Sequence, residues 1–213
     1  MARLLSLAAG VQIDVAPADM VTVAHDAGWP AVGIWFDGKT WTDTTSRDVR
    51  QRLDDTGVVA LDIEPIIPSQ DGNDFAEQLI EAAAVIGARH ILFTSRLKDQ
   101  ARTTDRYQQV CEMALPHGIK VVCEFLPIFP LNTLSKAAEI VANSRATNGG
   151  VLIDNLHLSR SGSSIVAPGG GRTARHLRLA ARSRGRTGAN VHRPPPAGWC
   201  RPAVQPPAHG TRP

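Results

Sequence analysis

Two carboxylates stand at the ends of short apolar runs, about thirty residues apart in the chain. Glu124 follows Val121-Val122-Cys123, and Asp154 follows Val151-Leu152-Ile153. An apolar run of this length predicts a strand that is buried on both faces. A carboxylate at its end is costly to desolvate unless a cation or a substrate pairs with it. Because neighbouring strands lie about 4.8 Å apart, we expect the two carboxylates to stand opposite one another and share one divalent cation.

Three further residues are candidates for contacting a substrate. His157 lies three residues after the second carboxylate, where a loop past the strand end can fold it over the site. Glu64 ends the run Leu61-Asp62-Ile63 in the same manner, and it is either a site residue or the partner of a nearby arginine. Arg160 either binds an anionic group of the substrate or is a solvent-exposed loop arginine. The alternative for the two strand-ending carboxylates is a structural role, as helix caps or in ion pairs.

An internal repeat of about thirty residues must position these side chains. Amphipathic segments between the apolar runs each end at a glycine, and the glycines at positions 28, 57, 87, 118 and 149 are 29, 30, 31 and 31 residues apart. Glycine just past a helix is the expected left-handed cap. One such helix is predicted over Arg47–Asp55, with Ser46 as its cap. The apolar runs begin near Leu4, Ala31, Val58, His90, Ile119 and Gly150.

Alternating strands and helices of this period are βα units of a parallel α/β fold. Either a (β/α)8 barrel of the TIM type or an open doubly wound sheet fits, and the absence of a glycine-rich nucleotide-binding motif favours the barrel. Eight units need roughly 240 residues, whereas the repeat covers residues 1–162. We therefore predict an incomplete barrel of about five and a half units, truncated after the sixth strand. Glu124 should face the barrel axis, with Cys123 and Phe125 toward the helices.

The segment 163–213 differs from the repeat in composition. It contains nine arginines and no lysine, aspartate or glutamate, a charge of +9, whereas residues 1–162 contain 14 Lys+Arg and 20 Asp+Glu, a charge of −6. Three interpretations remain open: a disordered basic extension, an arginine-rich nucleic-acid-binding tail, and a stretch translated out of frame. The predicted organisation is a partial barrel over 1–162 followed by a separate tail.

Cysteine content and hydropathy indicate the cellular compartment that we expect for the chain. Three cysteines without a C-x-x-C spacing are typical of a reducing cytoplasm and argue against a disulfide scaffold. No apolar run approaches the roughly 18 residues of a membrane span, so a membrane is not an expected partner.

A D-x-x-H element on the strand after one that ends in glutamate resembles the sugar phosphate isomerase/epimerase family. This family belongs to the xylose-isomerase-like TIM barrels, which also include the endonuclease IV type of DNA-repair enzyme. The element lies in Cys123–Pro127 and Gly150–Gly162. Ala27–Gly33 and Ala88–Leu92 are similar to the family's second and fourth strand entries, so the resemblance spans about residues 1–162.

The resemblance implies a divalent metal (Mn, Mg, Co or Zn) held by a Glu, an Asp, a His and a second Glu on strands five to eight. By position, Glu124 and Asp154 would be the first two ligands, and His157 would touch a substrate hydroxyl or a further ion. Where the later His and Glu should stand, the sequence has the arginine-rich tail, and no glutamate follows Glu139.

Three functions are therefore considered. The first is a metal-dependent isomerase or epimerase acting on a sugar or sugar phosphate through a metal-stabilised enediolate, with Glu124 moving the proton. It would be inactive if the last two ligands are missing. The second is an endonuclease IV-like metal phosphodiesterase, which needs more histidines than the first four units supply, so nucleic acid is not the expected partner. The third is a non-catalytic barrel fragment that binds metal weakly. We expect the first by lineage and the third for the polypeptide itself.

Overall fold

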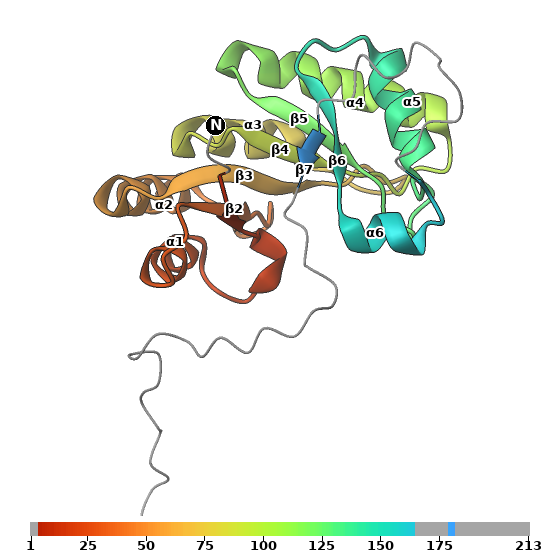
Figure 1. Ribbon diagram of the computed structural model, residues 1–213. Helices are drawn as coiled ribbons and strands as arrows, with labels where there is room; N and C mark the ends of the chain where they lie inside the picture. The colour runs from red at the N-terminus through yellow and green to blue at the C-terminus, as the bar shows by residue number, and fades with distance from the viewer. Residues whose placement is uncertain (1–3, 165–178, 182–213) are drawn as a thin grey trace, which may run out of the picture. The chain divides into compact units, whose positions relative to one another are not determined.

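Parallel strands form one sheet in the order β1-β2-β3-β4-β5-β6-β7 (Figure 1). The structure is a computed structural model that describes residues 4–164 and the backbone of 179–181. The first six strands coincide with the apolar runs, and the prediction of an α/β fold with an incomplete barrel is confirmed. The strands are β1 (Ser6–Leu7), β2 (Ala31–Trp35), β3 (Val59–Ile66), β4 (His90–Phe93), β5 (Lys120–Glu124), β6 (Gly149–Ile153) and β7 (Leu179–Ala181).

Strand β7 lies inside the segment that was predicted to be a separate tail, and it pairs with β6 in parallel. Apart from Ser163, Ser164 and β7, this segment falls outside the described residues. The domain boundary at residue 162 and the three interpretations of the tail therefore stay predictions.

Helices connect successive strands, and consecutive helices from α1 to α5 pack on one another. At the ends of α1, α2, α3 and η2, four of the repeat glycines adopt φ values between 69° and 75°, as their spacing predicted. At the fifth position the left-handed residue is Arg145, and Gly149 instead begins β6. The helices are η1 (Ala9–Val11), α1 (Pro17–Asp26), α2 (Asp43–Thr56), α3 (Ala76–Ile86), α4 (Gln100–Ala114), η2 (Leu115–His117), α5 (Leu134–Ser144) and α6 (Asn155–Arg160).

The sheet has two different faces. One face packs against the helices in a continuous apolar core, where the ring of Phe93 meets that of Tyr107 edge-on at 5.2 Å between centroids. The side chains at the alternate positions form a separate, small cluster of Leu92, Val122 and Leu152. We call these the helix-facing side and the inner side of the sheet, because a closed barrel would enclose the second set.

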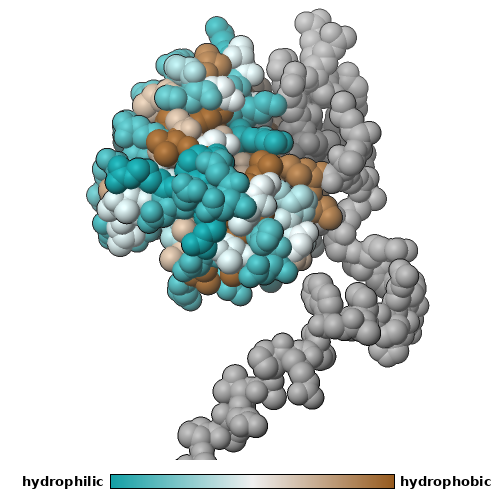
Figure 2. Space-filling model, turned by 90° about the vertical axis from the view of Figure 1, so that its left-hand side faces the viewer, coloured by the Kyte–Doolittle hydropathy of each residue, from teal (hydrophilic) through white to brown (hydrophobic). Residues whose placement is uncertain are grey.

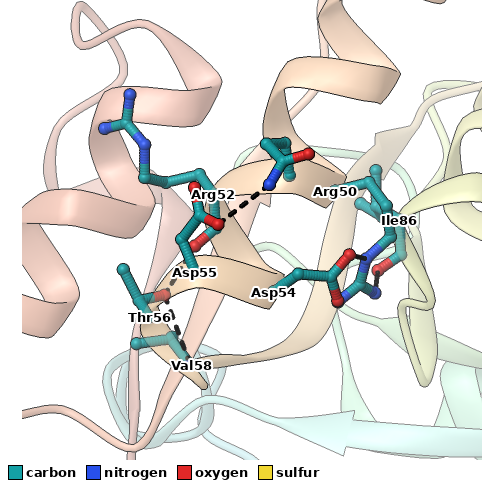
Figure 3. A network of polar contacts seen from close by, with 8 residues as sticks. Arg50, Arg52, Asp54, Asp55, Thr56, Val58 and Ile86 are labelled. Atoms are coloured by element: carbon teal, nitrogen blue, oxygen red, sulfur yellow. Dashed lines mark hydrogen bonds and ion pairs between the residues drawn. The ribbon is translucent and has the colours of Figure 1, made fainter.

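Arg50 links helix α2 to the end of α3 (Figure 3). The Arg50 guanidinium donates to the carboxylate of Asp54, 2.5 Å from Nη2 to Oδ1, and to the Ile86 carbonyl at the end of α3, 2.8 Å from Nη1. The helix begins at Asp43, four residues before the predicted start. Thr42 caps it in a capping box with Thr45, and Ser46 lies inside the helix, where its hydroxyl accepts from the indole N–H of Trp41 at 2.8 Å.

The surface of the described residues is mainly hydrophilic in the view of Figure 2, with hydrophobic patches separated by polar groups. Large apolar side chains are exposed around β1 and η1, at Leu4, Leu5, Val11 and Ile13. These residues lie at the β1 edge of the sheet, where a complete barrel would continue. Within the part of the chain that the structure describes, no helix is long and apolar enough to cross a membrane.

Candidate functional site

Three buried carboxylates lie on the inner side of the sheet. Asp62 and Glu64 of β3 and Glu124 at the end of β5 are 7%, 5% and 8% exposed. Their strand neighbours Ile63 and Cys123 belong to the helix-facing core, so alternation along each strand turns the carboxylates to the opposite side. The orientation predicted for Cys123 is thus confirmed, and burial raises the pKa of its thiol well above the ordinary range. Glu124 faces the inner side.

The sequence predicted that Asp154 stands directly opposite Glu124, and the structure places it differently. The register of β5 and β6 pairs Glu124 with Leu152, so Asp154 is two residues further along its strand rather than directly opposite. Its Oδ1 atom accepts hydrogen bonds from the backbone N–H groups of Leu156 at 2.7 Å and His157 at 3.0 Å. Asp154 is therefore the cap of α6, because the first turn of a helix has N–H groups that need an acceptor.

His157 and Arg160 belong to the short helix α6, whereas the sequence predicted a loop. His157 is half-buried one turn into the helix, and Arg160 is exposed at its last position. Residues three apart share a helix side, so these two side chains are neighbours. The predicted site residues therefore form two groups. Glu64 and Glu124 lie on the inner side of the sheet, on either side of β4, and the other three lie at the end of β6 and on α6.

Sequence reasoning missed two polar residues on the inner side, Asp62 and Thr94. Asp62 is two residues before Glu64 on the same strand, so the two-residue strand period was an available signal. Thr94 follows the last residue of β4 directly, and it is 2% exposed. Its backbone N–H continues the sheet ladder by donating to the carbonyl of Ile66 at 3.0 Å.

The donor atoms on the inner side are carboxylate and hydroxyl oxygens, the ligands that Mg²⁺ and Mn²⁺ prefer. Among the described residues, however, no group of three or more His, Cys, Asp or Glu side chains is arranged to hold a metal ion. Of the four ligands that the resemblance implies, only the positions of Glu124 and Asp154 fall among the described residues. The described residues therefore do not fit a complete cation site.

A cavity of about 420 Å³ lies away from these residues, between the loop after β3 and helix α4. It is lined by the ion pair of Asp74 and Arg106, 2.7 Å from Oδ1 to Nη2, in which the Asp74 side chain is 6% exposed. The hydrogen bond with Asp74 raises the pKa of the Arg106 guanidinium above its ordinary value. Since each charge compensates the other, we read this pair as structural. The cavity contains none of the predicted site residues.

The geometry defines a class: a parallel β/α half-barrel with acidic groups at the carboxyl ends of its strands. The chain belongs to the xylose isomerase-like TIM barrel family, whose family model matches residues 21–200. It is 25% identical over 97 residues to an inosose isomerase of Bacillus licheniformis, an alignment that covers 41% of this chain and 35% of the relative. The matched part thus spans about a third of the length of this curated relative.

Solved structures share the fold at low identity. An IolI protein with a bound zinc atom has a TM-score of 0.66 and 17% identity, covering 76% of this chain and 66% of that one. A D-psicose 3-epimerase solved in the presence of D-fructose has a TM-score of 0.64 and 15% identity, covering 76% of this chain and 67% of the other. At such identities these similarities establish the fold.

Proposed function

We propose that this chain is a divalent-metal-dependent isomerase or epimerase of a sugar, sugar phosphate or related polyol, with Glu124 as the group that transfers the proton. The observation that carries the proposal is the 8% exposure of Glu124 on the inner side of β5, at the end of the strand where barrel enzymes place their chemistry. A carboxylate held beside a bound substrate can accept a proton from a C–H bond next to a carbonyl. The inosose isomerase and the D-psicose 3-epimerase support a polyhydroxylated carbonyl compound as substrate class.

The other candidate residues would bind and orient the substrate or hold the cation. Glu64, on the strand beyond β4, would accept a hydrogen bond from a substrate hydroxyl. His157 and Arg160 of α6 would contact the far end of the substrate, where Arg160 suits a phosphate. Glu124 and Asp154 are the residues that would hold a cation. A bound Mn, Mg, Co or Zn ion would stabilise negative charge developing on a substrate oxygen.

We further propose that the polypeptide binds this cation weakly and turns over slowly. Two carboxylates, one of which already caps a helix, provide fewer contacts than a complete ligand set. The free, buried thiols of Cys111 and Cys123 support the reducing cytoplasm as its compartment. The proposed partner is a small molecule, not a membrane or nucleic acid.

Solvent deuterium incorporation tests the proposal, because it detects proton transfer even when net turnover is slow. The full chain with Mn²⁺ should incorporate deuterium beside the carbonyl of D-fructose in D₂O, followed by NMR. Glu124→Gln should lower this rate by roughly 100-fold or more. Glu112→Gln, which changes an exposed glutamate on α4, is the matched control and should leave it unchanged. The proposal fails if D-fructose, D-fructose 6-phosphate and an inosose all remain unlabelled with each of the four metals.

A further inference from the structure

Thr94 carries a buried hydroxyl for which the described part of the chain supplies no hydrogen-bond partner. The residue is 2% exposed, so bulk water does not serve this hydroxyl either. Its backbone is not in the same situation, because the N–H donates to Ile66. Folded proteins retain few such groups, since removing a hydroxyl from water without replacing its hydrogen bond opposes folding.

The next residue, Ser95, has a hydroxyl that does find hydrogen-bond partners within the protein. Ser95 is fully buried, its Oγ lies 3.1 Å from the hydroxyl of Thr103, and it accepts from the backbone N–H of Leu97 at 3.1 Å. Two successive hydroxyls thus point to opposite sides of the sheet. The one on the helix-facing side has protein partners, and the one on the inner side is left open.

Thr94 follows the strand that separates the two glutamates of the proposed site, and it lies nearer to Glu124. Strand β4 has β3 on one side and β5 on the other. The register pairs Leu92 with Val122 and Phe93 with Cys123, so the next step of the ladder brings Thr94 beside Glu124. On the other side, β3 pairs with β4 at Ile63–Ile91 and Ile66–Phe93, so Glu64 lies on the neighbouring strand before the position that borders Thr94.

We propose that Thr94 is a substrate-binding residue whose hydroxyl bonds to a hydroxyl group of the sugar or polyol. The identity of this ligand rests on the proposed function. An ionised carboxylate only accepts hydrogen bonds, whereas a threonine hydroxyl both donates and accepts. One substrate hydroxyl can therefore donate to a flanking glutamate and accept from Thr94. This arrangement complements a polyol and leaves the cation to the carboxylates.

The experiment compares Thr94→Val with Ser95→Ala in the full chain by melting temperature, by the KM of D-fructose in the deuterium assay, and by Mn²⁺ affinity. Thr94→Val keeps the side-chain shape and removes a hydroxyl without a partner, so its melting temperature should equal or exceed that of the wild type. Its KM for D-fructose should rise about tenfold, with Mn²⁺ affinity unchanged. Ser95→Ala should lower the melting temperature and leave KM as it is, because its hydroxyl serves the protein.

Two results overturn the inference. If Thr94→Val melts as far below the wild type as Ser95→Ala does, the protein itself uses the Thr94 hydroxyl. If the variant keeps the wild-type KM, the hydroxyl does not contact the substrate. A wild type that labels no substrate contradicts the proposed function instead. The melting comparison still decides in that case whether the hydroxyl is reserved for a ligand, because it needs no sugar.

Discussion

The helix-facing side and the inner side of this sheet come from the same strands, yet they differ in what they bury. The helix-facing side of β4 and β5 presents Ile91, Phe93, Cys123 and Phe125, all fully buried in one continuous core. The inner side presents a cluster of three aliphatic residues, followed toward the strand ends by carboxylates and Thr94. One side can be explained by packing alone, whereas the other holds polar groups that packing does not require.

This difference separates stability from chemistry within single strands. Burying apolar surface against helices stabilises the fold. Removing carboxylates from water opposes it, and so does burying a hydroxyl that has no hydrogen-bond partner among the described residues. Polar groups retained against this cost are the expected mark of a binding or catalytic site. Substitutions on the two sides should therefore have different consequences, although neighbouring residues are involved.

The largest expected effect is on the helix-facing side. Phe93→Ala should lower the free energy of unfolding by about 4 kcal/mol, because it empties a fully buried ring site against Tyr107. Leu92→Ala, one residue away in the small inner cluster, should cost about 2 kcal/mol. Urea denaturation of both variants measures the difference. Equal losses would show that the inner cluster is as important for stability as the helix-facing core.

The next effect is a pH dependence that arises on the helix-facing side. Burial raises the pKa of the Cys111 thiol to about 12. In the unfolded chain the thiol ionises near its ordinary value, so the stability it contributes is complete below about pH 8.5 and is lost as pH rises toward 12. Between pH 8 and 10.5, the free energy of unfolding should fall about 2 kcal/mol more for the wild type than for Cys111→Ala. Parallel curves from urea titrations at both pH values would contradict this assignment.

The smallest of the three effects concerns the backbone beside the inner carboxylates. A Cβ atom at Gly33 would lie 2.8 Å from the backbone N of Ala9 and 2.9 Å from Oδ2 of Asp62. Gly33→Ala should therefore cost about 1.5 kcal/mol, because backbone or carboxylate must shift to admit it. Gly10→Ala is a matched control, since a Cβ there meets nothing within 4 Å. A Gly33 variant as stable as the control in thermal unfolding would show that this contact relaxes freely.

The elements that sequence could predict are those with local signals. Apolar runs at Ala31 and His90 mark the starts of β2 and β4, since a buried strand needs little more than its own hydrophobic residues. The spacing of the glycines located helix ends because a left-handed cap is a property of one residue. The inner orientation of Glu124 follows from the two-residue period of a strand.

The features that the sequence did not predict depend on which of several possible hydrogen-bond or strand partners a residue has in the folded chain. Ser46 was the predicted cap of α2, but Thr42 and Thr45 form a capping box earlier in the chain, and Ser46 lies inside the helix as a partner of Trp41. Asp154 carries the right charge for a cation, yet the first turn of α6 uses one of its oxygens. The offset from Glu124 is a property of how two strands pair, which neither strand records alone. Thr94 is an ordinary residue until its surroundings show that its hydroxyl has no partner among the described residues.

One phenol on α4 joins the strands that carry the two acidic ligand candidates. The hydroxyl of Tyr107 donates to the carbonyl of Val121 in β5 at 2.9 Å and accepts from the amide of Gly150 in β6 at 3.0 Å. Gly149 leaves room for it, because a Cβ there would lie 2.8 Å from the phenol oxygen. Separating β5 from β6 would therefore also break at least one of these hydrogen bonds to Tyr107. The two strands that lead to the acidic residues are thus linked from the helix-facing side of the sheet, and the hydrogen bond to Tyr107 should slow exchange of the Gly150 amide proton while α4 stays packed against them.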